Sequence, residues 1–280
     1  MLARLVTVAT FGLALTASTA EADVFPGTET ETAGNVTATL TYTAKGDGVA
    51  SELVIARDGT EVLRAPAGTS ACGDEPAAMC GPPGAIGGPP AESLEVVDLD
   101  GDGEPEVIVD AYSGGAHCCT FSEISRWTGS GYVTKSRNWA DDGYRLDNTS
   151  GDASPEFVTG DSRFTYRFEA YAFSGRPVRI LAYAAGKFTD VTRQNLALVR
   201  TDAADQWASF RKVRRDKLGR GFAAAWAADQ YRLGKRPAAL RTLRSEARKG
   251  RLGALYDRTT AASFIKMLDR LLKSWGYAPG

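Results

Sequence analysis

The stretch Asp98-Leu-Asp-Gly-Asp-Gly-Glu-Pro-Glu-Val-Ile-Val109 places three aspartates at alternate positions, with Gly103 at the sixth place. Carboxylates at alternate positions of a tight loop can converge on one ion, and calcium takes six to eight oxygen ligands. The sequence therefore predicts a calcium site. Carboxylates of four residues and a backbone carbonyl of a fifth would form it: Asp98, Asp100, Asp102 and Glu106, with the carbonyl of Glu104.

The residues on either side of this loop distinguish it from an EF-hand. An EF-hand needs Glu at the twelfth position, which here holds Val109, and it needs flanking helices rather than the strand-like Glu106–Val109. Magnesium is the lesser candidate because it demands stricter octahedral geometry. An acidic turn without an ion is the alternative interpretation, although four carboxylates so close together repel one another unless a cation relieves them.

A degraded copy of the loop follows fifty positions later. Asn148-Thr-Ser-Gly-Asp-Ala-Ser-Pro-Glu-Phe157 repeats the pattern, but Ala153 replaces the glycine and only two carboxylates remain. Calcium affinity falls with ligand charge, so a structural turn is the favoured reading. If this copy bound an ion, the ligands would be Asn148, Ser150, Asp152 and Glu156.

Outward from the loops, residues 23–192 read as short strands separated by turns. Val36–Thr43 alternates with period two, and Asp58-Gly59 is a hairpin signal between two further strand patterns. Other expected strands include Phe121–Trp127, Phe164–Ala172 and Val178–Tyr183. The fold class predicted is mostly β, as blade-like repeats forming a sandwich or an open, partial propeller. Two or three blades are too few to close a ring, so an open stack or a homodimer is expected.

The remainder, 193–280, reads as a basic helical domain. Four helices are expected, at 202–213, 222–233, 237–247 and 261–275, the last with an apolar stripe at helical spacing. The charge changes at the same boundary, from a net −14 over 23–192 to a net +13 over 193–280. The favoured interpretation of this charge difference is that the two parts dock on each other. The alternative is that the basic part binds an anionic polymer or surface.

The chain opens with the layout of a secretory signal peptide. Arg4 precedes a short apolar run from Leu5 to Leu15, and Ala20-Glu21-Ala22 offers small residues for cleavage after Ala22. The run is too short to span a membrane. A signal peptide over 1–22 predicts a secreted or periplasmic protein without a transmembrane segment, for which nucleic acid is a poor partner and envelope polysaccharide or another anionic surface a better one.

Four cysteines and the lone histidine form the second chemical feature. An oxidising compartment favours disulfides, and three pairings are possible. Pairing of Cys72 with Cys80 and of the neighbours Cys118 with Cys119 is preferred, the second as a strained turn lock beside the calcium loop. A redox switch, or a metal site that includes His117, is the alternative for this segment.

The first loop resembles the FG-GAP/VCBS-type repeat, a calcium loop of integrin-like propellers and of many exported bacterial proteins. The likeness runs from Leu94 to Arg193, and Ser113-Gly-Gly-Ala-His-Cys-Cys119 resembles a group of exported bacterial proteins that carry the repeat. The resemblance implies calcium at the first loop and thins at the second, where the ligand pattern departs. It implies no single activity.

Three classes of function remain open on these grounds. The main hypothesis is a non-enzymatic, calcium-stabilised module for recognition or structure at the cell envelope. The rivals are an envelope glycan hydrolase that uses a pair of carboxylates and a thiol-redox or metal-handling protein centred on His117 and Cys119. A single histidine argues against histidine relays and zinc hydrolase motifs.

Overall fold

A computed structural model describes residues 24–46, 48–69, 72, 80–87, 91–114, 117–254 and 259–278. The expected signal peptide lies outside the described residues. The strands are β1 Gly27–Ala33, β2 Val36–Lys45, β3 Gly48–Arg57, β4 Thr60–Pro66, β5 Leu94–Val97, β6 Glu106–Tyr112, β7 Thr120–Trp127, β8 Tyr132–Ala140, β9 Arg145–Asp147, β10 Glu156–Gly160, β11 Val178–Ala184 and β12 Lys187–Asp190. The helices are α1 Pro83–Gly87, α2 Leu196–Val213, α3 Arg220–Arg232, α4 Arg236–Arg248 and α5 Ala261–Ser274, with short 3₁₀ turns η1 Ser162–Phe164, η2 Tyr171–Phe173 and η3 Thr192–Gln194.

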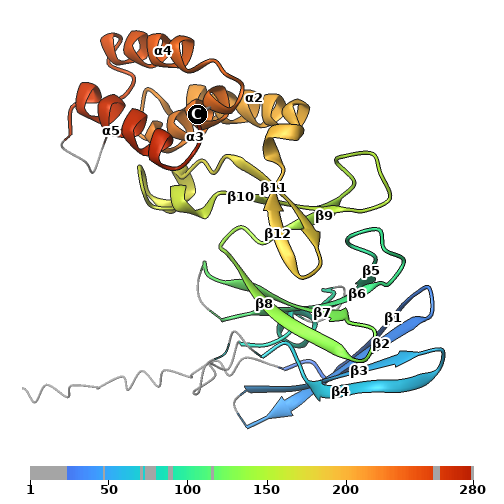
Figure 1. The fold of residues 1–280 in the computed structure, drawn as a ribbon. Helices are drawn as coiled ribbons and strands as arrows, with labels where there is room; N and C mark the ends of the chain where they lie inside the picture. The colour runs from blue at the N-terminus through green and yellow to red at the C-terminus, as the bar shows by residue number, and fades with distance from the viewer. Residues whose placement is uncertain are drawn as a thin grey trace, which may run out of the picture.

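Three four-stranded antiparallel sheets follow one another along the chain, each a meander in sequence order. Figure 1 shows them stacked, with β1–β4 at one end, β5–β8 in the middle and β9–β12 beside the helices. One apolar core joins the first and second sheets around Leu40 and Val107, and another joins the second and third around Trp139 and Phe157. The expectation of a mostly β chain with C-terminal helices is confirmed, while a propeller stays a prediction because the three described sheets do not close into a ring.

The repeat seen in the sequence corresponds to equivalent parts of two sheets. Both copies of the acidic loop join the first strand of a sheet to its second, β5 to β6 and β9 to β10. The first strands β1, β5 and β9 escaped prediction because they are short or polar, and pairing with the next strand holds them in place. At Asp58-Gly59 the predicted hairpin is confirmed, with φ +48° and +77° as a type I′ turn requires.

The predicted strand over Phe164–Ala172 is wrong. That segment forms the turns η1 and η2, and Phe164 and Phe168 enter the helical core together at a spacing of four. Asp161 caps η1 by accepting a hydrogen bond from the backbone N–H of Arg163 at 3.1 Å. The apolar residues here match a strand in composition, but packing against the helices rather than pairing with a neighbour strand decides their conformation.

Each end of the stack is covered in a different way. On the outer face of the first sheet, threonines of β1 and β2 pair across the strands, as Thr32 Oγ1 with Thr37 Oγ1 at 3.1 Å, and this face is polar and exposed. At the other end, α2 and α3 pack on the third sheet, where Val178 N–H donates to Asp202 Oδ2 at 2.9 Å. A polar terminal sheet and a helical cover are how a repeat stack ends without a further repeat.

The helices form their own core around Tyr231, Leu243, Phe264 and Leu268. Some basic side chains of the helical part pair with its acidic ones, as Arg214 does with Glu246 at 3.0 Å and Arg236 with Asp269 at 2.8 Å. Across the boundary, the described contacts are hydrogen bonds and ring contacts, such as Tyr277 Oη to Asp161 Oδ2 at 2.6 Å. The seven acidic residues of 193–280 offset only part of its twenty basic ones, so docking of the two parts through opposite charge stays a prediction. Among the described residues, no helix has both the length and the apolarity to cross a bilayer.

Candidate metal centre

The first acidic loop is organised by its own backbone. Gly101 and Gly103 have φ of +75° and +85°, a region that favours glycine. Their N–H groups donate to Asp98 Oδ1 at 2.7 Å and Oδ2 at 2.9 Å. Glu104 N–H donates to Asp102 Oδ1 at 2.8 Å. These bonds turn the loop sharply enough for alternate side chains to approach one another.

Three of the predicted ligands meet in this loop. Asp98, Asp100 and Glu106 each offer a carboxylate oxygen within 4.8 Å of the others. Calcium–oxygen distances of about 2.3–2.6 Å put ligands on opposite sides of the ion about 5 Å apart. The spacing is thus right for a single calcium ion between the three side chains. Among the described residues, this is the one cluster of three metal-binding side chains.

Glu106 is the buried member of the cluster. Its side chain is 0% exposed, and Leu99 N–H donates to its Oε2 at 3.0 Å. Oε1 of Glu106 and Oδ1 of Asp100 are buried without a hydrogen-bond partner. Burial first, and then the charges of Asp100, Asp102 and Asp98, raise the pKa of Glu106 to about 7 against the stabilising bond from Leu99. Buried acceptors without a donor are costly, and a cation between the three carboxylates would relieve that cost.

The other two predicted ligands lie differently. Asp102 is exposed and stands outside the three-residue cluster, with Oδ1 engaged by the loop backbone. The side chain of Glu104 pairs with the Arg57 guanidinium of β3. The predicted ligand from Glu104 is its backbone carbonyl, which this side-chain pairing does not test, so that role stays a prediction.

The second loop keeps the turn but changes the interior. Gly151 N–H donates to Asn148 Oδ1 at 2.7 Å and Thr149 N–H to Glu156 Oε2 at 2.8 Å, as in the first loop. However, the Asn148 amide also donates to the Asp152 carbonyl, and Thr149 Oγ1 donates to Glu156 at 2.8 Å. The second loop thus has side-chain donors, Asn148 and Thr149, where the first has the carboxylate of Asp98 and the apolar Leu99. Ser150 has no such bond described, and these four residues do not form a metal cluster among those described.

The first loop also joins the three sheets to one another. Arg57 of the first sheet pairs with Glu104, and its guanidinium lies 4.5 Å from the Trp127 ring centroid of the second sheet. Ala185, in the turn between β11 and β12 of the third sheet, donates its N–H to Asp100 Oδ2 at 3.0 Å. The sequence carried no signal for Arg57 or Ala185, because both contacts come from segments remote in the chain. An ion held here would therefore fix the junction of all three sheets.

The segment with the lone histidine lies at the other end of β6. The acidic loop precedes Glu106 and the cysteine turn follows Tyr112, so the seven residues of β6 separate the two by about 20 Å. The predicted position beside the calcium loop is therefore wrong. The exposed His117 ring instead stacks on Tyr171, with centroids 4.1 Å apart.

The sulfur atoms pair as preferred from the sequence. Cys72 is bonded to Cys80 at 2.03 Å, and Cys118 is bonded to Cys119. None of the four described cysteines is free. His117 and the cysteine pair do not belong to a metal cluster among the described residues.

Fold and site together define a three-sheet β-repeat protein with a helical end and an acidic loop at the sheet junction. A stretch of 136 residues, 47% of this chain, is 33% identical to an uncharacterized protein of Sinorhizobium fredii and covers 21% of that protein. A stretch of 159 residues, 52% of the chain, is 29% identical to a probable thylakoid lumen protein of Synechocystis and covers 45% of it. The chain thus spans less than half the length of these curated relatives. No family model and no solved structure matches the chain.

Proposed function

We propose that this protein is exported and acts outside the cytoplasm as a binding module whose three sheets are held in register by calcium. The observation that carries the proposal is the buried Glu106 carboxylate, which faces Asp98 and Asp100 with an oxygen that no donor satisfies. An uncompensated buried charge is expensive. A divalent cation would supply the missing positive charge at the one loop that contacts all three sheets.

Calcium suits this donor set better than other ions. The three side chains offer oxygen atoms alone, which favours hard cations over zinc or copper. The loop is partly open, so water could complete a shell of six to eight ligands. The resemblance of Asp98–Val109 to the FG-GAP/VCBS-type loop supports the same choice.

Export is supported by three separate observations. The N-terminal pattern is typical of a cleaved signal peptide. One relative is named a probable thylakoid lumen protein, which places that protein in a compartment reached by export. The two disulfides suit an oxidising compartment. An envelope polysaccharide remains the proposed partner, and a homodimer the proposed assembly if one forms.

Thermal unfolding with calcium and with chelator tests the metal. Wild-type protein should melt several degrees higher with calcium, because an ion bound only to the folded state adds stability. Asp100→Asn should abolish that difference. Asp152→Asn, at the place of the second loop that matches Asp102, should leave it intact. Equal melting temperatures of the wild-type protein in calcium and in chelator would contradict the proposed stabilisation by calcium.

A glycan hydrolase is the second candidate, and a specific observation favours it. Asp142 lines a cavity far from the acidic loop together with Asp202 and Asp205. Burial raises the pKa of Asp142 to about 6, against the opposing charge of Arg176, which suits an acid catalyst. Release of reducing ends from envelope glycans, lost in Asp142→Asn, would support hydrolysis, whereas binding without release supports the module.

A further inference from the structure

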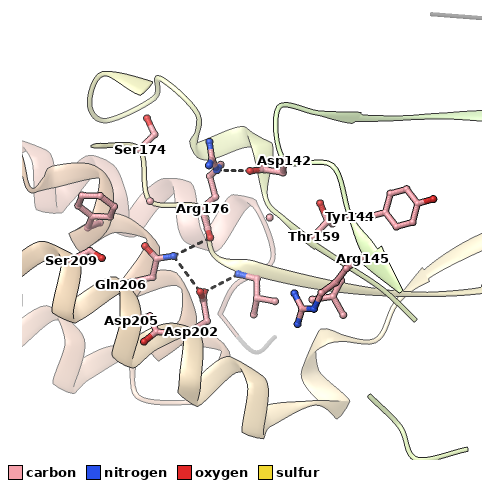
Figure 2. Close-up of a pocket in the computed structure, with 15 residues that line it drawn as sticks. Asp142, Tyr144, Arg145, Thr159, Ser174, Arg176, Asp202, Asp205, Gln206 and Ser209 are labelled. Atoms are coloured by element: carbon pink, nitrogen blue, oxygen red, sulfur yellow. Dashed lines mark hydrogen bonds and ion pairs between the residues drawn. The ribbon is translucent and has the colours of Figure 1, made fainter. Parts of the chain in front are cut away.

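A polar cavity of about 510 Å³ opens between the third sheet and α2, which we name the helix-side cavity. Figure 2 shows Asp202, Asp205 and Gln206 projecting from α2 on one side and Asp142 with Arg176 on the other. A cavity of this size lies within the range of small-ligand sites. Its walls mix donors and acceptors, and large apolar side chains are few, which suits a ligand rich in hydroxyl groups.

Asp142 and Arg176 hold each other at this cavity but are incompletely satisfied. They form an ion pair, yet Oδ2 of Asp142 and Nη1 of Arg176 are buried without a hydrogen-bond partner. The Asp142 side chain is 7% exposed. An unmatched acceptor beside an unmatched donor favours a group that both donates and accepts, and a hydroxyl group does so. Their burial means that a ligand must shift the ion pair slightly to reach them.

A second cavity of about 420 Å³, the sheet-side cavity, adjoins the first, and Tyr144 and Arg145 line both. Four carboxylates line it and only one guanidinium, so it is strongly acidic; these are Glu31, Glu92, Glu95 and Asp110, with Arg145. Across the two cavities, acidic groups outnumber basic ones, and an anionic ligand would be repelled. The paired cavities run past the first strands of the sheets, since Glu31, Glu95 and Arg145 line them.

Tyr166 lines neither cavity, but its backbone is hydrogen-bonded to Ser174, which lines the helix-side cavity. Tyr166 has φ +57°, which is strained for a bulky residue, and its side chain is 58% exposed. Its N–H donates to Ser174 Oγ at 3.0 Å, and its ring lies 5.5 Å from that of Tyr171. An exposed ring held in a strained conformation points to function. A flat, exposed ring next to a lining residue is suited to stack on the apolar face of a sugar that extends out of the cavity.

We propose that the two cavities and Tyr166 form one binding site for an oligosaccharide without negative charge. Hydroxyl groups would bond to the cavity walls, the sugar face would stack on Tyr166, and the acidic sheet-side cavity would reject uronate or phosphate polymers. This inference refines the proposed binding role and rests on it. It also narrows the partner expected from the sequence, because an anionic polymer does not suit this site.

Calorimetric titration of the full calcium-loaded protein tests the site. The probes are oligomers of equal length of neutral hexose, of N-acetylhexosamine, of amino sugar and of galacturonate. We expect binding of at least one neutral or amino-sugar oligomer and no binding of galacturonate. Calcium binding is read from the melting temperature, so that the metal proposal and this one can fail separately. No heat with any neutral or amino-sugar oligomer, or tighter binding of galacturonate, would overturn the site.

Tyr166→Gly separates binding from folding. Glycine tolerates a positive φ, so the variant should melt at the same or a higher temperature than wild type. Loss of the ring should weaken oligosaccharide binding by about three- to tenfold. Phe25→Ala removes another exposed ring, one with no described contact to a lining residue of either cavity, and should leave affinity unchanged. Unchanged affinity in Tyr166→Gly would contradict the contact of this ring with the sugar.

Asp205→Asn tests the wall of the helix-side cavity. Asp205 is exposed and lines the cavity, so loss of its charge should lower affinity several-fold without lowering the melting temperature. Asp216→Asn, an exposed aspartate just past the end of α2, is the matched control and should bind as wild type does. Equal affinity in Asp205→Asn and Asp216→Asn would place the ligand elsewhere.

Discussion

Replacing Glu106 by glutamine should change stability in opposite directions with and without calcium. Glu106 is fully buried beside two other carboxylates, and its pKa is raised from 4.5 to about 7. At about 1.4 kcal/mol per pH unit, ionising it in the metal-free fold costs about 3 kcal/mol at most, and about 1–3 kcal/mol once water screening is allowed for.

The direction with pH follows from proton binding. An acid with a raised pKa in the folded state binds more protons there than in the unfolded chain. The cost is therefore absent below pH 4.5, grows as pH rises toward 7, and is complete above 7. In chelator at pH 8, the free energy of unfolding of Glu106→Gln should be about 1–3 kcal/mol higher than that of wild type. This difference corresponds to roughly 2–10 °C in melting temperature. At pH 4 the two should be nearly equal.

Calcium reverses the order. At about a thousandfold excess of ion over its Kd, wild type gains about 4.1 kcal/mol, more than the advantage of the variant in chelator, while the variant lacks the charge that the ion needs. The assay is urea unfolding at pH 4 and pH 8, each with chelator and with calcium. Glu156→Gln is the control, because Thr149 already donates to that carboxylate and no calcium effect is expected. The reasoning would be refuted if Glu106→Gln were less stable than wild type in chelator at pH 8 and were still stabilised by calcium.

Three further predictions concern the junction of the sheets, the helical part and the second acidic loop. Arg57→Leu should lower the free energy of unfolding by about 2–4 kcal/mol in denaturant titration, since it leaves Glu104 without its partner and removes the contact with Trp127. Asp229→Asn should flatten the pH dependence of stability and raise stability at pH 8, because burial raises the pKa of Asp229 well above its usual range; a steeper loss of stability with rising pH would contradict this. The substitutions Asn148→Asp, Ser150→Asp and Ala153→Gly together give the second loop the ligands and the glycine of the first. Native mass spectrometry of this variant should then show two bound calcium ions instead of one. An unchanged number of ions would show that the type of ligand is not what prevents the second loop from binding calcium.

Sequence reasoning located the acidic loop because its information is local. Alternating carboxylates and glycines at fixed spacing specify a tight turn whatever surrounds it, and the hydrogen bonds of Gly101 and Gly103 to Asp98 are of that kind. The four helices were found for a similar reason, since their apolar spacing repeats within each segment. Short first strands such as β9, and the turns at Phe164–Phe168, depend on neighbours that the chain reaches later.

The sequence by itself determined which residues could bind a cation, the β-then-α order of the chain and the matching of the two acidic loops. Only the tertiary structure decided that Oε1 of Glu106 is buried without a hydrogen-bond donor, that Arg57 and Ala185 meet the loop from other sheets, and that two cavities adjoin at Tyr144. The physical reason is that burial and charge balance depend on segments far apart in the chain, whereas turn geometry depends on neighbours.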